Sequence, residues 1–128
     1  HIAALTVMGG RLLDLDCHAN VHLYPGLSRE RYEKLLQTCS IYLDISHAQE
    51  ILDGSRTALE NGMILYAFKE MCHHPEFYAT DHLFSRDGVA ELIDELSQLV
   101  NPEKYQFAYD KQKMNPCLVT REELKLLF

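Results

Sequence analysis

The residues best suited to chemistry in this chain lie in one short segment, HAQEILDGSRTALE (residues 47–60). The segment stands between two apolar runs, IYLDI (41–45) and MILYAF (63–68), each of which predicts a buried strand. Because ligands in open parallel sheets bind beyond the carboxyl ends of the strands, we expect a ligand here. His47 could donate a hydrogen bond to a phosphate or a sugar hydroxyl, or act as a base. A turn histidine that bonds only to local backbone explains this residue equally well.

The same segment predicts a helix over about residues 50–61, with Asn61-Gly62 as its C-terminal cap. Its first turns carry Glu50, Asp53 and Ser55. The N–H groups and partial positive charge of a helix N-terminus suit a phosphate or a diphosphate. Because the two acids already supply negative charge there, two hypotheses stay open: these side chains contact a ligand, or they only stabilise the start of the helix.

Asp44 is an acidic residue inside the apolar run at 41–45. An unpaired carboxylate in such a strand would be costly. We therefore expect Asp44 to pair with a neighbouring strand end or loop, and contact with a ligand is the alternative.

The string MCHHPEFYATDH (71–82) resembles a metal cluster in composition, with candidate ligands at Cys72, His73, His74, Asp81 and His82. Adjacent side chains rarely converge on one ion, and the paired Cys and His ligands of zinc sites are absent. The sequence therefore predicts no metal site and no cofactor. A loop that faces a sugar or a protein partner is the better interpretation.

Apolar patterning predicts an α/β fold with a Rossmann-like parallel sheet. Strands are expected at 2–8, 20–26, 41–45, 63–68 and 82–84, and helices after Ser28, over 50–61 and over 89–100. Right-handed crossovers between parallel strands place the helices on both faces of the sheet. We expect one domain over residues 1–100, followed by a less regular extension over 101–128 with a short terminal helix capped at Thr120.

Composition excludes several classes of protein. The 128-residue chain has a formal net charge of −7, which disfavours a nucleic-acid partner. No apolar stretch is long enough to span a bilayer. The four cysteines lie too far apart in sequence to indicate a disulfide framework. We therefore expect a cytoplasmic protein. The opening HIAALTVM lacks an initiator Met, which suggests a fragment without its first elements, whose exposed strand edge could pair with a second copy.

Four strings resemble one family: HIAALTVM, NVHLYPG, YLDISHAQEILDG and ILYAFKE. Together, over residues 2–85, they resemble the C-terminal half of a GT-B glycosyltransferase. More narrowly, they resemble the companion subunit of the bacterial O-GlcNAc transferase that modifies serine-rich repeat adhesins of the accessory Sec system. The resemblance implies two partners, a catalytic glycosyltransferase subunit and a serine-rich acceptor polypeptide. It also implies a location in the cytoplasm, including the inner face of the cell membrane.

Active retaining GT-B enzymes typically carry two glutamates, eight positions apart, that contact the donor sugar and the ribose. Here Glu50 and Glu60 stand ten positions apart, and alignment from MILYAF puts Arg56 and Ala48 at the family positions. Neither side chain can accept a hydrogen bond from a hydroxyl. The resemblance therefore implies a weakened donor site, although a shift of one helical turn would restore Glu60.

Three hypotheses follow. The first is a non-catalytic companion that binds the transferase and its acceptor polypeptide. The second is the UDP-sugar donor domain of an active glycosyltransferase, with His47, Glu50 and Glu60 at the site. The third is a regulatory module of another Rossmann-like family. The third is weak because neither G-x-G-x-x-G nor G-K-[ST] occurs in the chain.

Overall fold

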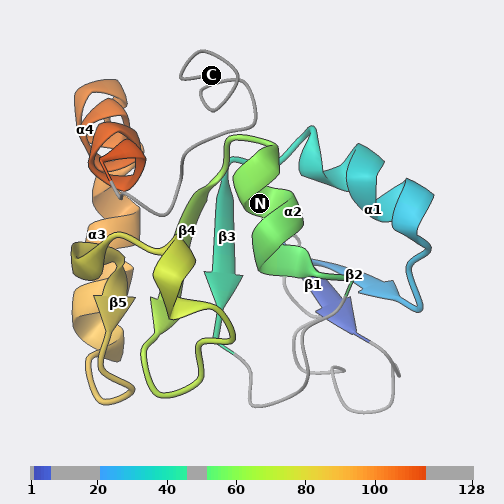
Figure 1. The fold of residues 1–128 in the computed structure, drawn as a ribbon, viewed down its shortest axis with the longest axis horizontal. Helices are drawn as coiled ribbons and strands as arrows, with labels where there is room; N and C mark the ends of the chain where they lie inside the picture. Colours follow the sequence, from blue (N-terminus) through green and yellow to red (C-terminus); the bar gives the residue numbers. More distant parts are fainter. Residues whose placement is uncertain (1, 7–20, 46–51, 115–128) are drawn as a thin grey trace, which may run out of the picture.

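The computed structural model describes residues 2–6, 21–45 and 52–114. Its five strands are β1 (Ile2–Thr6), β2 (Val21–Pro25), β3 (Ile41–Asp44), β4 (Ile64–Phe68) and β5 (Leu83–Phe84). Its helices are α1 (Arg29–Leu36), α2 (Gly54–Glu60), α3 (Val89–Gln98) and α4 (Pro102–Lys113), with 3₁₀ turns η1 (Pro75–Phe77) and η2 (Thr80–His82). Every strand pair is parallel, in one sheet of order β1-β2 and a second of order β3-β4-β5 (Figure 1). The predicted parallel α/β architecture is confirmed.

Strand β4 is the centre of the fold because both of its faces are covered. All five of its residues are buried. Leu65 and Ala67 pack into a core with side chains of α1 and α2, whereas Ile64, Tyr66 and Phe68 pack into a second core with α3 and α4. This alternation is the period of two that a strand imposes on its side chains. The helices therefore cover both faces of the sheet, as the sequence predicts.

Local sequence signals explain the ends of two helices. The Ser28 hydroxyl caps the start of α1 by accepting a hydrogen bond from the Arg31 N–H at 3.3 Å, as expected.

Helix α2 ends at a glycine. Gly62 has φ +75°, a value that glycine adopts without strain. The N–H groups of Gly62 and Met63 donate to the carbonyls of Leu59 and Ala58, which completes a Schellman motif. The predicted cap at Asn61-Gly62 is confirmed.

The start of α2 differs from the prediction. The helix begins at Gly54 rather than near Glu50, because Leu52 and Asp53 have φ values of 55° and 50° and lie outside the right-handed helical region. Tertiary contacts fix this start. The Gly54 carbonyl accepts a hydrogen bond from the Tyr32 hydroxyl at 3.3 Å, and the Tyr42 side chain occupies the space that a Cβ at Gly54 would need. The sequence signal for an earlier start is overridden by these contacts.

Residues 102–113 form α4, a helix that the sequence analysis did not predict. The Asn101 side chain caps it by accepting from the N–H groups of Glu103 and Lys104, and Pro102 occupies its first turn. Ala108 and Gln112 are buried against the sheet. The terminal helix expected near Thr120 lies outside the described residues. Among the described residues, no helix is long and apolar enough to cross a membrane.

Candidate functional site

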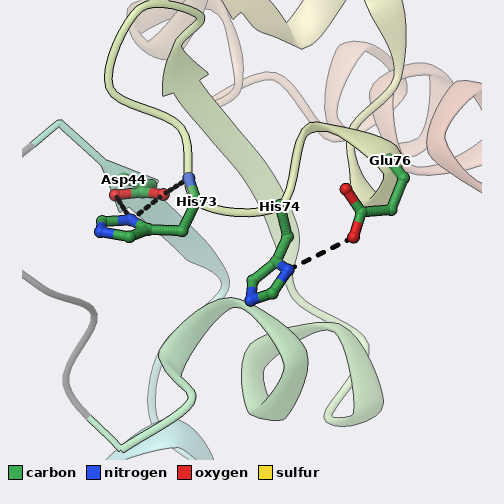
Figure 2. Close-up of polar contacts among 4 residues, drawn as sticks. All are labelled: Asp44, His73, His74 and Glu76. Atoms are coloured by element: carbon green, nitrogen blue, oxygen red, sulfur yellow. Dashed lines mark hydrogen bonds and ion pairs between the residues drawn. The ribbon is translucent and has the colours of Figure 1, made fainter.

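The carboxyl edge of the three-stranded sheet brings together an aspartate and a histidine. Asp44 is the last residue of β3, and His73 lies in the loop that follows the neighbouring strand β4. One Asp44 carboxylate oxygen accepts from the His73 backbone N–H at 3.0 Å and lies 2.9 Å from its ring Nδ1 (Figure 2). The expected pairing of Asp44 with a neighbouring loop is confirmed.

The two members of this pair differ in exposure. The Asp44 side chain is 5% exposed, whereas that of His73 is 26% exposed. A buried carboxylate needs hydrogen bonds to replace its hydration, and the two bonds from His73 supply them. The carboxylate in turn favours a proton on Nδ1 and fixes the orientation of the ring. The pair therefore consists of a buried acceptor and an imidazole at the surface.

A second group of side chains lies beside this pair. The His74 ring points away from His73, and its Nδ1 lies 3.3 Å from the Glu76 carboxylate (Figure 2). The same ring stacks on Phe77 with centroids 5.0 Å apart, and the Arg56 guanidinium lies 5.6 Å from the Phe77 centroid. Arg56 thus links α2 to the loop after β4 through a cation–π contact.

The structure separates the predicted site residues. His47 and Glu50 lie outside the described residues. Asp53 is exposed at the edge of the site, but its side chain makes no capping hydrogen bond, and Ser55 is fully buried within α2. Arg56 contacts Phe77, as described above.

Glu60 is exposed at the last position of α2. At 1.5 Å per residue, it stands about 9 Å along the helix axis from Gly54. It therefore lies toward the opposite edge of the sheet from Asp44 and His73, and any contact of Glu60 with a ligand stays a prediction.

The histidine-rich string does not converge on one point. His73 pairs with Asp44, and His74 pairs with Glu76. Asp81 binds the Lys111 ammonium at 2.7 Å, which lowers the pKa of the aspartate. In the part of the chain that the structure describes, no three His, Cys, Asp or Glu side chains are placed to hold a metal ion. The two acids in this string, Glu76 and Asp81, are therefore each paired with a basic residue.

Two members of the string are poor candidates for chemistry because burial keeps them neutral. Burial raises the pKa of the Cys72 thiol to about 11, so the thiolate that would act as a nucleophile is scarce. His82 is 1% exposed, and its ring packs on Tyr66 with centroids 4.4 Å apart. Burial lowers the His82 pKa to about 4. Both residues are therefore part of the core.

Sequence reasoning anticipated one half of the central pair and missed the other. Asp44 stands out in the sequence as an acid in an apolar strand, whereas His73 stands out only as one member of the string at 71–82, which suggests a metal cluster or a loop that faces a sugar or a partner. The signal that could have joined them is topological. Loops that follow neighbouring parallel strands meet at one edge of the sheet, so an acid ending one strand and a polar loop after the next belong together.

Residues 1–112 match a protein family described as GftB/GlyA-F C-terminal domain. The chain belongs to this family. The family assignment confirms the resemblance inferred from the four sequence strings, and it argues against a regulatory module of another Rossmann-like family.

Relatives in this GftB/GlyA-F family include proteins named UDP-N-acetylglucosamine–peptide N-acetylglucosaminyltransferase stabilizing protein GtfB. The one from Streptococcus pneumoniae is 40% identical over 73% of this chain, and the one from Streptococcus agalactiae is 32% identical over 98%. A chain of the crystal structure of a GtfA/B complex bound to UDP and GlcNAc has a TM-score of 0.77 and 30% identity, covering 98% of this chain and 29% of its own length. The two relatives are covered over 21% and 28% of their length, so the chain spans less than a third of the proteins it matches.

Proposed function

We propose that this chain is the C-terminal domain of a non-catalytic companion, a subunit that stabilises a peptide N-acetylglucosaminyltransferase. The observation that carries the proposal is the similarity to proteins named as stabilising proteins of such an enzyme, at 32–40% identity over 73–98% of the chain. The GtfA/B complex supports it, because a segment of one chain of that assembly shares the fold over 98% of this chain. The proposed partners are the catalytic subunit and its acceptor polypeptide.

The geometry of the carboxyl edge supports a companion more than a donor domain. A nucleotide-sugar presents ribose and sugar hydroxyls that need acceptors such as carboxylates. Two of the carboxylates described at this edge, those of Asp44 and Glu76, are engaged by His73 and His74, whereas the exposed Asp53 carboxylate makes no capping hydrogen bond. Glu60 is distant along α2, and Arg56 offers only donors.

Copurification tests the proposal. The full-length protein that carries this chain and the cognate catalytic subunit are mixed and passed over a sizing column. We expect one stable complex, and we expect the isolated catalytic subunit to aggregate or lose activity faster than the complex. Two separate peaks, with a catalytic subunit equally durable alone, would contradict the proposal.

The alternative is an active donor domain, and a specific observation favours it. A glycosyltransferase named GlyD from Streptococcus pneumoniae is 34% identical over 57% of this chain, although the chain covers only 9% of that protein. Calorimetric titration of UDP and then UDP-GlcNAc into the full-length protein separates the two functions. The companion function predicts no binding, whereas the donor function predicts binding that Glu60→Ala weakens.

The proposal also includes a place in the cell. A companion of such a transferase would work in the cytoplasm, including the inner face of the cell membrane. Fractionation of cells that express the tagged full-length protein tests this location. Recovery of the tagged protein in the culture medium or on the outer surface of the cell would contradict it.

A further inference from the structure

Strand β3 is paired along one edge only. Among the described strands its sole neighbour is β4. The pairing begins where the Ser40 carbonyl accepts a hydrogen bond from the Ile64 N–H at 3.0 Å. Because successive residues of a strand alternate in direction, the N–H and C=O groups of Ile41 and Leu43 point away from β4. Such a row of backbone donors and acceptors is a template for a further strand.

The side chains of this strand are less covered than those of its neighbour. Leu43 is 37% exposed, and Ile45, directly after the strand, is 44% exposed. All five residues of β4 are buried. Parallel sheets in proteins are covered on both faces, and their strands are apolar for that reason. The apolar edge of β3 is therefore a surface suited to another element of structure.

The strand order indicates what that element is. Strands β1 and β2 form one parallel sheet, and β3, β4 and β5 form a second. Figure 1 shows the two sheets apart, with no strand of the described part of the chain between β1 and β3. In the common doubly wound order, the first strand in sequence lies in the middle of the sheet, with the second and third on one side and the fourth, fifth and sixth on the other. The five strands here fit the second to the sixth of these positions.

We propose that a parallel strand from the part of the full-length protein that precedes β1 in sequence lies between β1 and β3 and joins the two sheets into one. Its backbone pairs with Ile41 and Leu43 on one side and with β1 on the other. Its side chains are apolar on both faces, as in β4. This chain covers 21% and 28% of the length of two relatives, so proteins of this family are long enough to supply such a strand. The inference is independent of the companion function.

Hydrogen exchange of the full-length protein, resolved to single amides, tests the proposal. We expect the N–H groups of Ile41 and Leu43 to exchange at least about a hundredfold more slowly than in an unfolded chain, because each is held in a strand ladder. The N–H groups of Tyr42 and Asp44 face β4 and serve as the internal control. Fast exchange of the first pair beside slow exchange of the control pair would overturn the proposal.

Two further arms identify the source of the protection. Protection that disappears on dilution would assign the edge of β3 to a second copy of the protein. Protection that requires the catalytic subunit would assign it to that partner. Either result overturns the proposal, whereas protection in the protein alone, at every concentration, supports it. Because these arms do not measure stabilisation of the transferase, the companion function can fail or hold independently.

A pair of variants at Leu43 gives a second readout. Proline is tolerated in an edge strand where its nitrogen faces solvent, but it breaks the ladder between two strands. Leu43→Ala is the matched control, because it removes the same apolar side chain and keeps the N–H. We expect Leu43→Pro to lower the melting temperature of the full-length protein by several degrees more than Leu43→Ala. Equal melting temperatures would show that the edge is unpaired and would overturn the proposal.

Discussion

Gln112 of α4 completes the edge of strand β4 at Leu65. Its side-chain oxygen accepts a hydrogen bond from the Leu65 N–H at 2.8 Å, and its side-chain nitrogen donates to the Met63 carbonyl at 2.8 Å. Strand β5 pairs only with Ala67 and Phe68, so it does not reach this part of the edge. The amide of one glutamine therefore takes the place of a strand, and it anchors α4 to the sheet.

Replacement of this glutamine should destabilise the domain strongly. Gln112→Ala leaves the Leu65 N–H and the Met63 carbonyl buried without a partner, which predicts a loss of about 2–4 kcal/mol in the free energy of unfolding. Urea denaturation of the full-length protein measures it. Gln106→Ala is the matched control, because that exposed glutamine on the same helix bonds only to Asp110, and it should change stability by less than about 0.5 kcal/mol. Similar losses in both variants would show that the edge contact is unimportant.

Buried His82 predicts that the domain loses stability as the pH falls. Burial lowers its pKa from 6.5 to about 4, so the unfolded chain binds the proton more readily than the folded one. Protonation therefore favours unfolding, and stability present above pH 6.5 is lost as the pH falls toward 4. At 1.36 kcal/mol per pKa unit the full loss is about 3 kcal/mol.

Urea denaturation across this pH range, compared with His82→Leu, isolates the effect of His82. Lowered pKa values at Asp81 and Glu70 also remove stability in acid, but both groups are present in both proteins. The Lys111 ammonium lowers the His82 pKa, and the Asp81 carboxylate opposes it. The difference between wild type and variant should therefore grow as the pH falls. Parallel curves would contradict the assignment.

The start of α2 makes a third prediction. A Cβ added at Gly54 would collide with the Tyr42 hydroxyl and lie 3.0 Å from the ring carbon Cε2. Gly54→Ala should therefore destabilise the domain by about 1–3 kcal/mol. Thermal unfolding measures the loss, and the double variant with Tyr42→Phe provides the control. Because Phe lacks the colliding oxygen, the two substitutions should cost less together than the sum of their separate effects. Strict additivity would show that the contact with Tyr42 does not select glycine.

Signals that are local in sequence predicted much of this fold. The apolar run at 63–68 predicted a strand covered on both faces, and β4 is buried throughout. Ser28 caps the start of α1, and Gly62 follows the C-terminal end of α2, as their residue types predict. These features depend on side-chain period and backbone conformation, which neighbouring residues determine.

Helix α4 was missed for two reasons. The helix expected over 89–100 stops just before Asn101-Pro102, and Asn before Pro is also a signal for the start of a helix. The row of α4 that packs on the sheet contains Tyr105, Ala108, Tyr109 and Gln112, and only one of these is a small apolar residue. Their spacing of i, i+3, i+4 and i+7 is helical, but burial of Gln112 depends on the unpaired edge of β4, which local sequence does not report.

The candidate site was predictable only in part. Asp44 was expected to have a partner, because an apolar strand makes a lone carboxylate costly. Its partner lies 29 positions away, and only the parallel pairing of β3 with β4 brings the two together. The same dependence on tertiary contacts explains why α2 begins at Gly54, where Tyr32 and Tyr42 meet it.

The measurement that tests the central claim most directly is the melting temperature of the catalytic transferase, titrated with the full-length protein that carries this chain. A partner that binds the folded state stabilises it by RT ln(1 + [L]/Kd), so the companion function predicts a rise that continues with concentration. At about one hundred times Kd the stabilisation should reach about 2.7 kcal/mol. A melting temperature that stays constant, with a folded protein that binds UDP-GlcNAc on its own, would contradict the claim and establish a donor domain instead.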